Sequence, residues 1–184
     1  NLKSVPKRYD SLWERKCKLK LENTLLKVGV DKTSFLVTVQ PGTSKPERAW
    51  HVERFGILCQ KLIKEHRMKI ILLGDRKERQ MLEKISELCS VGMTTIVCEL
   101  NLQEIAQLLV VSRLFIGNDS GMMHLASLVG TPVVGIFGPG HSETTGPFLI
   151  TEKQEIVTKN YPCSPCRQHF FKECKPSPHN KPYC

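Results

Sequence analysis

Short apolar segments alternate with segments of helical periodicity through the middle of the chain, and this alternation restricts the fold more than any other feature. Runs of strand length occupy residues 35–39, 68–73, 94–98, 114–116 and 132–137. Between them, apolar residues recur at helical spacing in residues 52–63, 81–88, 102–109 and 121–129. Strands separated by single helices predict βαβ units and a parallel sheet. We therefore predict an α/β, Rossmann-like domain with helices flanking the sheet.

The composition changes on either side of this domain, which we assign to residues 31–160. Residues 1–30 mix apolar and charged residues and predict a lead-in helix from a preceding N-terminal domain that the chain lacks. The chain begins at Asn1 without a Met or a signal-peptide pattern, so we expect a fragment of a longer protein. Residues 161–184 are rich in Pro and Cys and predict a separate, loop-built tail module.

The formal net charge is +9, and its distribution constrains the partners. Residues 31–150 carry thirteen Lys and Arg against twelve Asp and Glu, so the excess lies in the two ends. A nucleic-acid-binding fold usually carries a basic stripe of its own, and we expect no nucleic-acid partner. Basic ends are typical either of a solvated surface or of attraction to an anionic membrane. We expect a cytoplasmic protein and leave peripheral association with the inner face of a membrane open.

The eight cysteines form two populations. Four lie singly in periodic segments and are interpreted as small buried hydrophobes: Cys17, Cys59, Cys89 and Cys98. The other four lie in the tail: Cys163, Cys166, Cys174 and Cys184. Two thiols on one tight turn are half of a tetrahedral metal site, so the tail cysteines predict one structural Zn²⁺, with His169 or His179 as substitute ligands. Disulfides and free thiols remain alternatives.

The segment after the fourth predicted strand carries the strongest chemical signal. Asn118, Asp119 and Ser120 are all good helix N-caps, and Gly121 allows close approach to the first helical turn. Free amide groups and the helix dipole there suit a phosphate. His124 lies one turn further on. The alternative is an ordinary capped helix between two strands.

The loops after the other strands carry weaker signals. Thr43 and Ser44 offer hydroxyl groups after the first strand, and Arg48 offers a positive charge for a phosphate. Glu78, after the second strand, has a carboxylate that is a candidate to accept from ribose hydroxyls or from an exocyclic amine. Residues 137–147 form a long loop whose threonines are candidates for contact with a diphosphate. Each of these residues, taken alone, is equally typical of a solvated turn or a helix start.

Residues 117–126, 130–134, 137–139 and 145–147, in this order, resemble the C-terminal domain of glycosyltransferase family 9. That family contains the ADP-heptose:lipopolysaccharide heptosyltransferases. The resemblance extends from about residue 35 to residue 184. It implies the GT-B fold, in which two Rossmann-like domains face each other, and it makes this chain the C-terminal, donor-binding half.

The resemblance also implies roles for individual residues. Asp119 would contact the donor sugar, and Glu78 the adenosine. The diphosphate would lie against the first turn that Ser120 and Gly121 open, with His124 beside it. Thr43 and Ser44 would lie near the phosphates. Arg48 stands close to where the family usually has a Lys, which keeps the charge but changes the geometry.

The implied reaction is inverting transfer from an ADP-sugar to a lipopolysaccharide core acceptor. The catalytic base would come from the absent N-terminal domain, and no cofactor is expected for catalysis. Two alternatives remain open. One is a nucleotide-sugar epimerase of the GT-B type, and the other is a basic, zinc-containing nucleic-acid-binding module.

Overall fold

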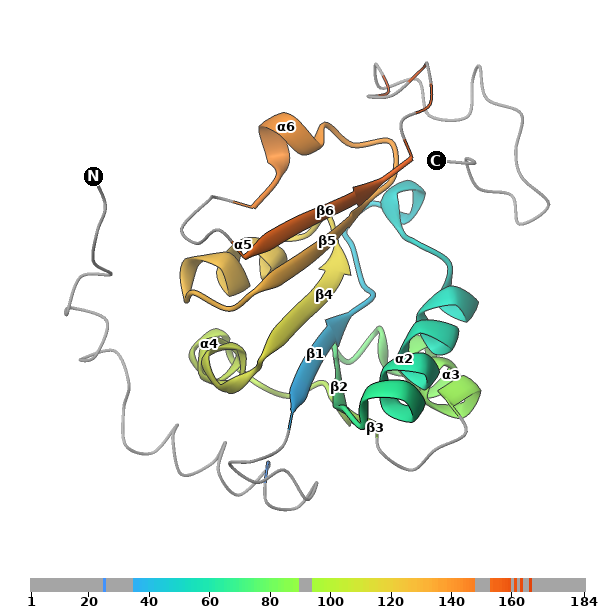
Figure 1. Ribbon diagram of the computed structural model, residues 1–184, viewed down its shortest axis with the longest axis vertical. Coiled ribbons are helices and arrows are strands. Elements are labelled where there is room, and N and C mark those ends of the chain that lie inside the picture. Colours follow the sequence, from blue (N-terminus) through green and yellow to red (C-terminus); the bar gives the residue numbers. More distant parts are fainter. Residues whose placement is uncertain are drawn as a thin grey trace.

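A computed structural model of the 184-residue chain describes residues 25, 35–89, 94–147, 153–159, 161, 163 and 166. These residues form one sheet of six parallel strands in the order β3-β2-β1-β4-β5-β6 (Figure 1). The strands are β1 (Leu36–Gln40), β2 (Lys69–Leu73), β3 (Thr94–Val97), β4 (Leu114–Asn118), β5 (Val133–Phe137) and β6 (Gln154–Thr158). The predicted Rossmann-like parallel sheet is confirmed. The predicted domain boundaries stay predictions.

The sixth strand, β6, was not predicted. It pairs with β5 at the edge of the sheet, and its residues alternate between exposed and half-buried. Gln154 and Glu155 interrupt the apolar pattern, because a strand at the edge with a partly open face does not need a continuous apolar run. β1, in contrast, is buried at all five positions and was evident from the sequence.

The helices agree with the predicted periodicity, with two short additions. The four long ones are α2 (Val52–His66), α3 (Arg79–Cys89), α4 (Leu102–Val111) and α5 (Gly121–Leu128). The expected loops contain the one-turn elements η2 (Pro46–Arg48) and α6 (Ser142–Thr145). Gly130, with φ of 84°, follows the end of α5 as predicted. Within the described ranges, no helix is both long and apolar enough to cross a bilayer.

Long helices cover both faces of the sheet. Helices α2 and α3 lie on one face, and α4 and α5 on the other (Figure 1). Val37 and Val39 point into the α2 side of the core, and Leu36 points into the α4 side, as the two-residue period of a strand requires. Three of the four cysteines predicted to be buried are confirmed: Cys59, Cys89 and Cys98. Cys17 lies outside the described residues.

The order of the strands also indicates where a ligand binds. Strand β1 pairs with β2 on one side and with β4 on the other. The chain therefore runs outward in opposite directions from β1 and from β4. In open parallel sheets, ligands bind at the carboxyl ends of the strands where the order reverses. Here that position is formed by the loops that follow β1 and β4.

Candidate functional site

Asn118, the last residue of β4, braces the loop that follows β1. It is fully buried, its Nδ2 donates to the carbonyl of Pro41 at 2.6 Å, and its Oδ1 accepts from the backbone N–H of Trp50 at 3.0 Å. One side chain thus satisfies backbone groups at both ends of the loop. The loop after β1 is therefore held in a fixed position beside the end of β4.

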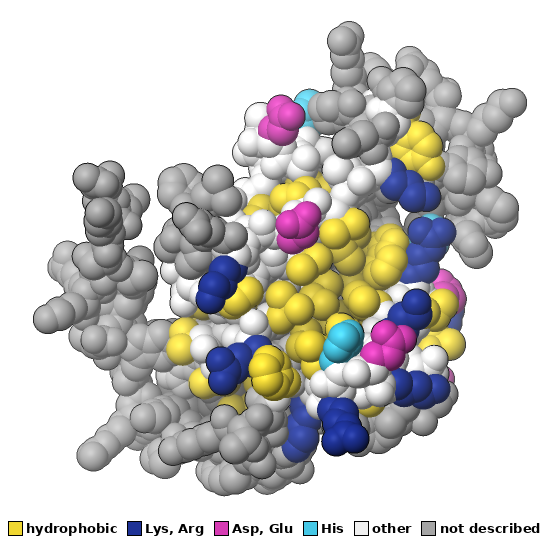
Figure 2. All heavy atoms as spheres, viewed as in Figure 1, with side chains coloured by type: hydrophobic (Ala, Val, Ile, Leu, Met, Phe, Trp, Pro, Cys, Tyr) yellow, Lys and Arg dark blue, Asp and Glu magenta, His cyan; other side chains and the backbone are white. Residues whose placement is uncertain are grey.

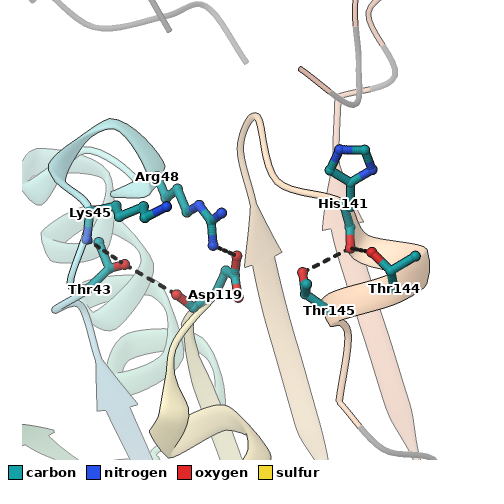
Figure 3. Close-up of polar contacts among 7 residues, drawn as sticks. All are labelled: Thr43, Lys45, Arg48, Asp119, His141, Thr144 and Thr145. Carbon is teal, nitrogen blue, oxygen red and sulfur yellow. Dashed lines mark hydrogen bonds and ion pairs between the residues drawn. The ribbon is translucent and has the colours of Figure 1, made fainter. Parts of the chain in front are cut away.

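Asp119 and Arg48 form an ion pair between these two loops. Arg48 Nη1 lies 2.6 Å from Asp119 Oδ2, and the two side chains are 24% and 7% exposed. Thr43 Oγ1 donates to the backbone carbonyl of Asp119 at 3.2 Å (Figure 3). The Nε of Arg48 is buried and has no hydrogen-bond partner in the described part of the chain. The structure thus brings Thr43, Arg48 and Asp119 together, and their roles toward a donor stay predictions.

The start of α5 differs from the capped helix expected as the alternative. Ser120 is the N-cap residue by position, yet it makes no capping hydrogen bond, and its hydroxyl donates to Gln40 Oε1 at 2.8 Å. The three cap-type side chains of residues 118–120 all turn toward the end of β1 and the loop that follows it, where they find hydrogen-bond partners. The first turn of α5 is thereby left without a side-chain cap.

Gly121 and His124 lie on the accessible side of this helix start. Both are exposed. A Cβ placed on Gly121 would meet nothing within 4 Å, so a ligand can approach the backbone closely. Uncapped amide groups, the helix dipole and the nearby guanidinium together favour an anion. His124 is placed one turn into α5, as predicted.

Glu78 reaches the site from the loop after β2. Its Oε2 accepts from the backbone N–H of Asp75 at 2.9 Å, and its other carboxylate oxygen lies over Gly42 in the loop after β1. The sequence places Glu78 and Gly42 far apart, and the parallel sheet brings them together because the carboxyl ends of β1 and β2 are neighbours. Gln40, which contacts Ser120, was missed by the sequence analysis. Its one signal was a polar residue directly after an apolar run.

The remaining predicted residues lie further from this cluster or are exposed. Ser44 is exposed next to Thr43. Thr144 and Thr145, expected in a loop, lie in α6 and donate to the carbonyl of His141 at 3.3 and 2.8 Å (Figure 3). A one-turn helix forms there because these hydroxyl groups stabilise its first carbonyl.

An apolar groove of about 540 Å³ lies beside the site on the α2 face of the sheet. It runs between α2 and β6, and Figure 2 shows hydrophobic side chains gathered in the middle of this face. Its apolar lining includes Leu58, Leu62, Ile116, Val134, Ile136 and Val157. Arg48 and Trp50 also line it, so the groove adjoins the ion pair. The sequence did not indicate this groove.

The predicted zinc site falls mostly outside the described residues. Cys163 is exposed and Cys166 is half-buried, and both thiols are free. Cys174, Cys184, His169 and His179 are not among the described residues. Within the part of the chain that is described, no group of three or more His, Cys, Asp or Glu side chains is arranged to hold a metal. The zinc site stays a prediction.

Comparison with known proteins identifies the family of this chain. The sequence profile of glycosyltransferase family 9 (heptosyltransferase) matches residues 10–175. The chain belongs to glycosyltransferase family 9. Among its family 9 relatives, the lipopolysaccharide core heptosyltransferase OpsX of Haemophilus influenzae is 29% identical over 112 residues, covering 60% of this chain and 32% of that protein. Lipooligosaccharide heptosyltransferase 2 of Campylobacter jejuni is 27% identical over 168 residues, covering 89% and 50%. The chain thus spans half or less of the length of these two relatives.

Solved structures share the fold. The glycosyl transferase family 9 structure from Veillonella parvula superposes with a TM-score of 0.71 at 21% identity, covering 79% of this chain and 41% of that one. The structure of E. coli heptosyltransferase WaaC with ADP superposes with a TM-score of 0.62 at 17% identity, covering 69% of this chain and 38% of that one. UDP-GlcNAc 2-epimerase from Neisseria meningitidis superposes with a TM-score of 0.54 at 14% identity, covering 69% of this chain and 33% of that one. The family 9 chain therefore has the architecture of one half of a GT-B heptosyltransferase.

Proposed function

We propose that this family 9 chain binds the donor of a heptosyltransferase-like glycosyltransferase, an ADP-sugar, at the carboxyl ends of β1 and β4. The observation that carries the proposal is the Arg48–Asp119 pair beside the uncapped start of α5. It combines a cation and backbone N–H groups for a diphosphate with a carboxylate for sugar hydroxyls. The fold shared with WaaC, whose structure holds ADP, supports adenine as the base.

Different residues of the site would bind different parts of the donor. The first-turn amides of α5 and Arg48 would hold the diphosphate, with Thr43, Ser44 and His124 around it. Asp119 would accept hydrogen bonds from the donor sugar. In the reaction, the same positive groups would stabilise the charge that develops on the leaving diphosphate.

Transfer itself needs groups that we assign to the rest of a longer protein. We propose inverting displacement at the anomeric carbon, with a base outside this chain removing the proton of the acceptor hydroxyl. The names of the relatives support a lipopolysaccharide core as the acceptor. A glycolipid acceptor would bring the protein to a membrane surface, which the basic ends of the chain would favour.

Calorimetry tests the donor site directly. The chain is titrated with ADP, UDP and GDP and with their sugar derivatives. We expect the ADP compounds to bind best, and Asp119→Ala and His124→Ala each to lower the affinity for the sugar nucleotide about tenfold. Far-UV circular dichroism serves as the control for folding. Wild-type affinity in both variants would show that the site lies elsewhere.

One observation favours a second candidate function. The superposition with UDP-GlcNAc 2-epimerase indicates that an epimerase can have this architecture. An epimerase acts on a nucleotide sugar without an acceptor. Incubation of the chain with UDP-GlcNAc alone, followed by product analysis, separates the two functions. Formation of a sugar epimer would favour this second candidate.

A further inference from the structure

The carboxylate of Glu78 is held in one orientation by its own loop. Its Oε2 accepts from the backbone N–H of Asp75 at 2.9 Å, and Asp75 Oδ1 accepts from the backbone N–H of Glu78 at 2.9 Å. This reciprocal pair is of the capping-box kind and uses one carboxylate oxygen. The second oxygen, Oε1, extends across the loop after β1.

Gly42 provides the space for that second oxygen. A Cβ on Gly42 would collide with Glu78 Oε1 and would lie 2.5 Å from the carboxylate carbon, Cδ. The backbone does not require glycine here, because Gly130 alone among the described glycines has a positive φ. The absence of a side chain at Gly42 therefore has a steric purpose, which is to let Glu78 cross from β2 to β1.

Gln40 extends the same contact toward the start of α5. Its Nε2 lies 2.8 Å from the position of that Cβ, and its Oε1 accepts from Ser120. Gln40 is 6% exposed, so its amide has little freedom to turn. Gly42 thus lies between the Glu78 carboxylate and the helix start that Ser120 opens.

We propose that Gly42 is a positioning residue: by leaving room for the Glu78 carboxylate, it lets that group lie where the ribose of the nucleotide donor arrives. The inference rests on the proposed function. A carboxylate at the end of a strand accepts hydrogen bonds from ribose hydroxyls, while the diphosphate lies at a helix start. Gly42 sets the distance between these two groups. A side chain at this position displaces the Glu78 carboxylate and also presses on Gln40. The loss of the nucleoside contact is therefore measured against the diphosphate contact, which both probes share.

Two variants displace the carboxylate by different means. Gly42→Ala pushes Glu78 away, and Glu78→Asp withdraws the carboxylate without adding bulk, so the second variant tests the proposal even if the first fails to fold. The double variant combines them. The probes are ADP and 2′,3′-dideoxy-ADP, which lacks the ribose hydroxyls, and the readout is the ratio of their affinities. We expect a ratio of about ten in the wild type and about one in all three variants.

Amide hydrogen exchange of the ligand-free protein tests the positioning alone. The N–H of Asp75 is expected to exchange about tenfold faster in Gly42→Ala, because its acceptor has moved. The N–H of Asn101, which donates to Glu104 Oε2 at 2.8 Å in the capping box of α4, is the internal control and should not change.

The outcomes distinguish the positioning of Glu78 by Gly42 from the contact between Glu78 and the nucleoside. Unchanged exchange at Asp75 in Gly42→Ala overturns the positioning role. Faster exchange together with an unchanged affinity ratio overturns the link to the nucleoside. A wild type that binds neither nucleotide overturns the proposed function and the ribose contact, while the exchange at Asp75 still reports whether Gly42 positions Glu78.

Discussion

Asp119 is a carboxylate with 7% of its surface exposed, and Arg48 is its partner at 2.6 Å. Removal of one member of a largely buried pair leaves an uncompensated charge. We predict that Arg48→Ala lowers the free energy of unfolding by about 2 kcal/mol, less than for a fully buried pair because Arg48 is partly exposed. Arg48→Lys should retain part of this stability. Urea denaturation followed by circular dichroism measures both variants.

The exposed pair of Lys84 and Glu53 is the matched control. Its atoms lie 2.8 Å apart, but the side chains are 57% and 51% exposed. Lys84→Ala should change the free energy of unfolding by no more than about 0.5 kcal/mol. An equal loss in Arg48→Ala and Lys84→Ala would contradict the structural role of the buried pair.

A substitution at Gly121 should affect the stability of the fold and the binding of the ligand in different ways. A Cβ there meets no protein atom within 4 Å, and Gly121 is the first residue of α5. We predict that Gly121→Ala keeps or raises stability, by up to about 1 kcal/mol, since alanine favours a helix over glycine. The methyl group should lower the affinity for ADP about tenfold by obstructing the diphosphate. Thermal denaturation and calorimetry measure the two effects, and a loss of stability would count against an open helix start.

At the scale of elements, two helices end in a left-handed backbone conformation, which suits the residue at one end and not at the other. Arg67 ends α2 with φ of 53°, and Gly130 follows α5 with φ of 84°. The left-handed conformation disfavours any residue with a Cβ. We predict that Arg67→Gly raises the free energy of unfolding by about 0.5 kcal/mol and that Gly130→Ala lowers it by about 1 kcal/mol. Chemical denaturation of the pair checks both signs, and a change of the same sign in both variants would refute this reasoning.

Helices α2 and α3 pack through two fully buried thiols, Cys59 and Cys89. A hydrogen bond to Cys89 and burial together raise the pKa of Cys59 above its ordinary value of 9.0. A thiol whose pKa is raised by folding stabilises the native state fully below the unfolded pKa, and this stability is lost as the pH rises above it. We predict that the free energy of unfolding falls above about pH 9, by up to about 1.4 kcal/mol per pH unit.

The variant Cys59→Ala tests the origin of this slope. It should reduce the dependence on pH above pH 9, although it also lowers stability at all pH values by removing a buried group. In native protein, a thiol reagent should modify the exposed Cys163 and leave Cys59 unmodified. An unchanged slope in Cys59→Ala would assign the pH dependence to other groups.

At the scale of the whole molecule, the described residues contain a single sheet, whereas GT-B enzymes use two facing domains. We predict that the 184-residue chain binds an ADP-sugar but does not transfer the sugar. The assay combines the purified chain, ADP-heptose and a truncated lipopolysaccharide core, with a complete family 9 enzyme as the positive control. Product formed by the chain alone would mean that it contains the base, and Asp119 and Glu143 would be the first residues to test.

The sequence by itself determined the elements of the family 9 fold. Apolar runs and helical periods are local, so five of six strands and all four long helices were evident, as was the Gly121 helix start. Strand β6 was not, because an edge strand needs no continuous apolar run.

Only the tertiary structure decided which side chains contact one another. The side chains of residues 118–120 were predicted as local caps, but they contact residues about 70 to 80 positions away, since β4 lies beside β1. The same neighbourhood of strands brings Glu78 over Gly42 and leaves the apolar groove beside α2. Helical and strand periods repeat over a few residues, whereas the order of strands in the sheet is set by packing between distant segments. Which side chains of the candidate site meet therefore depended on the sheet as a whole.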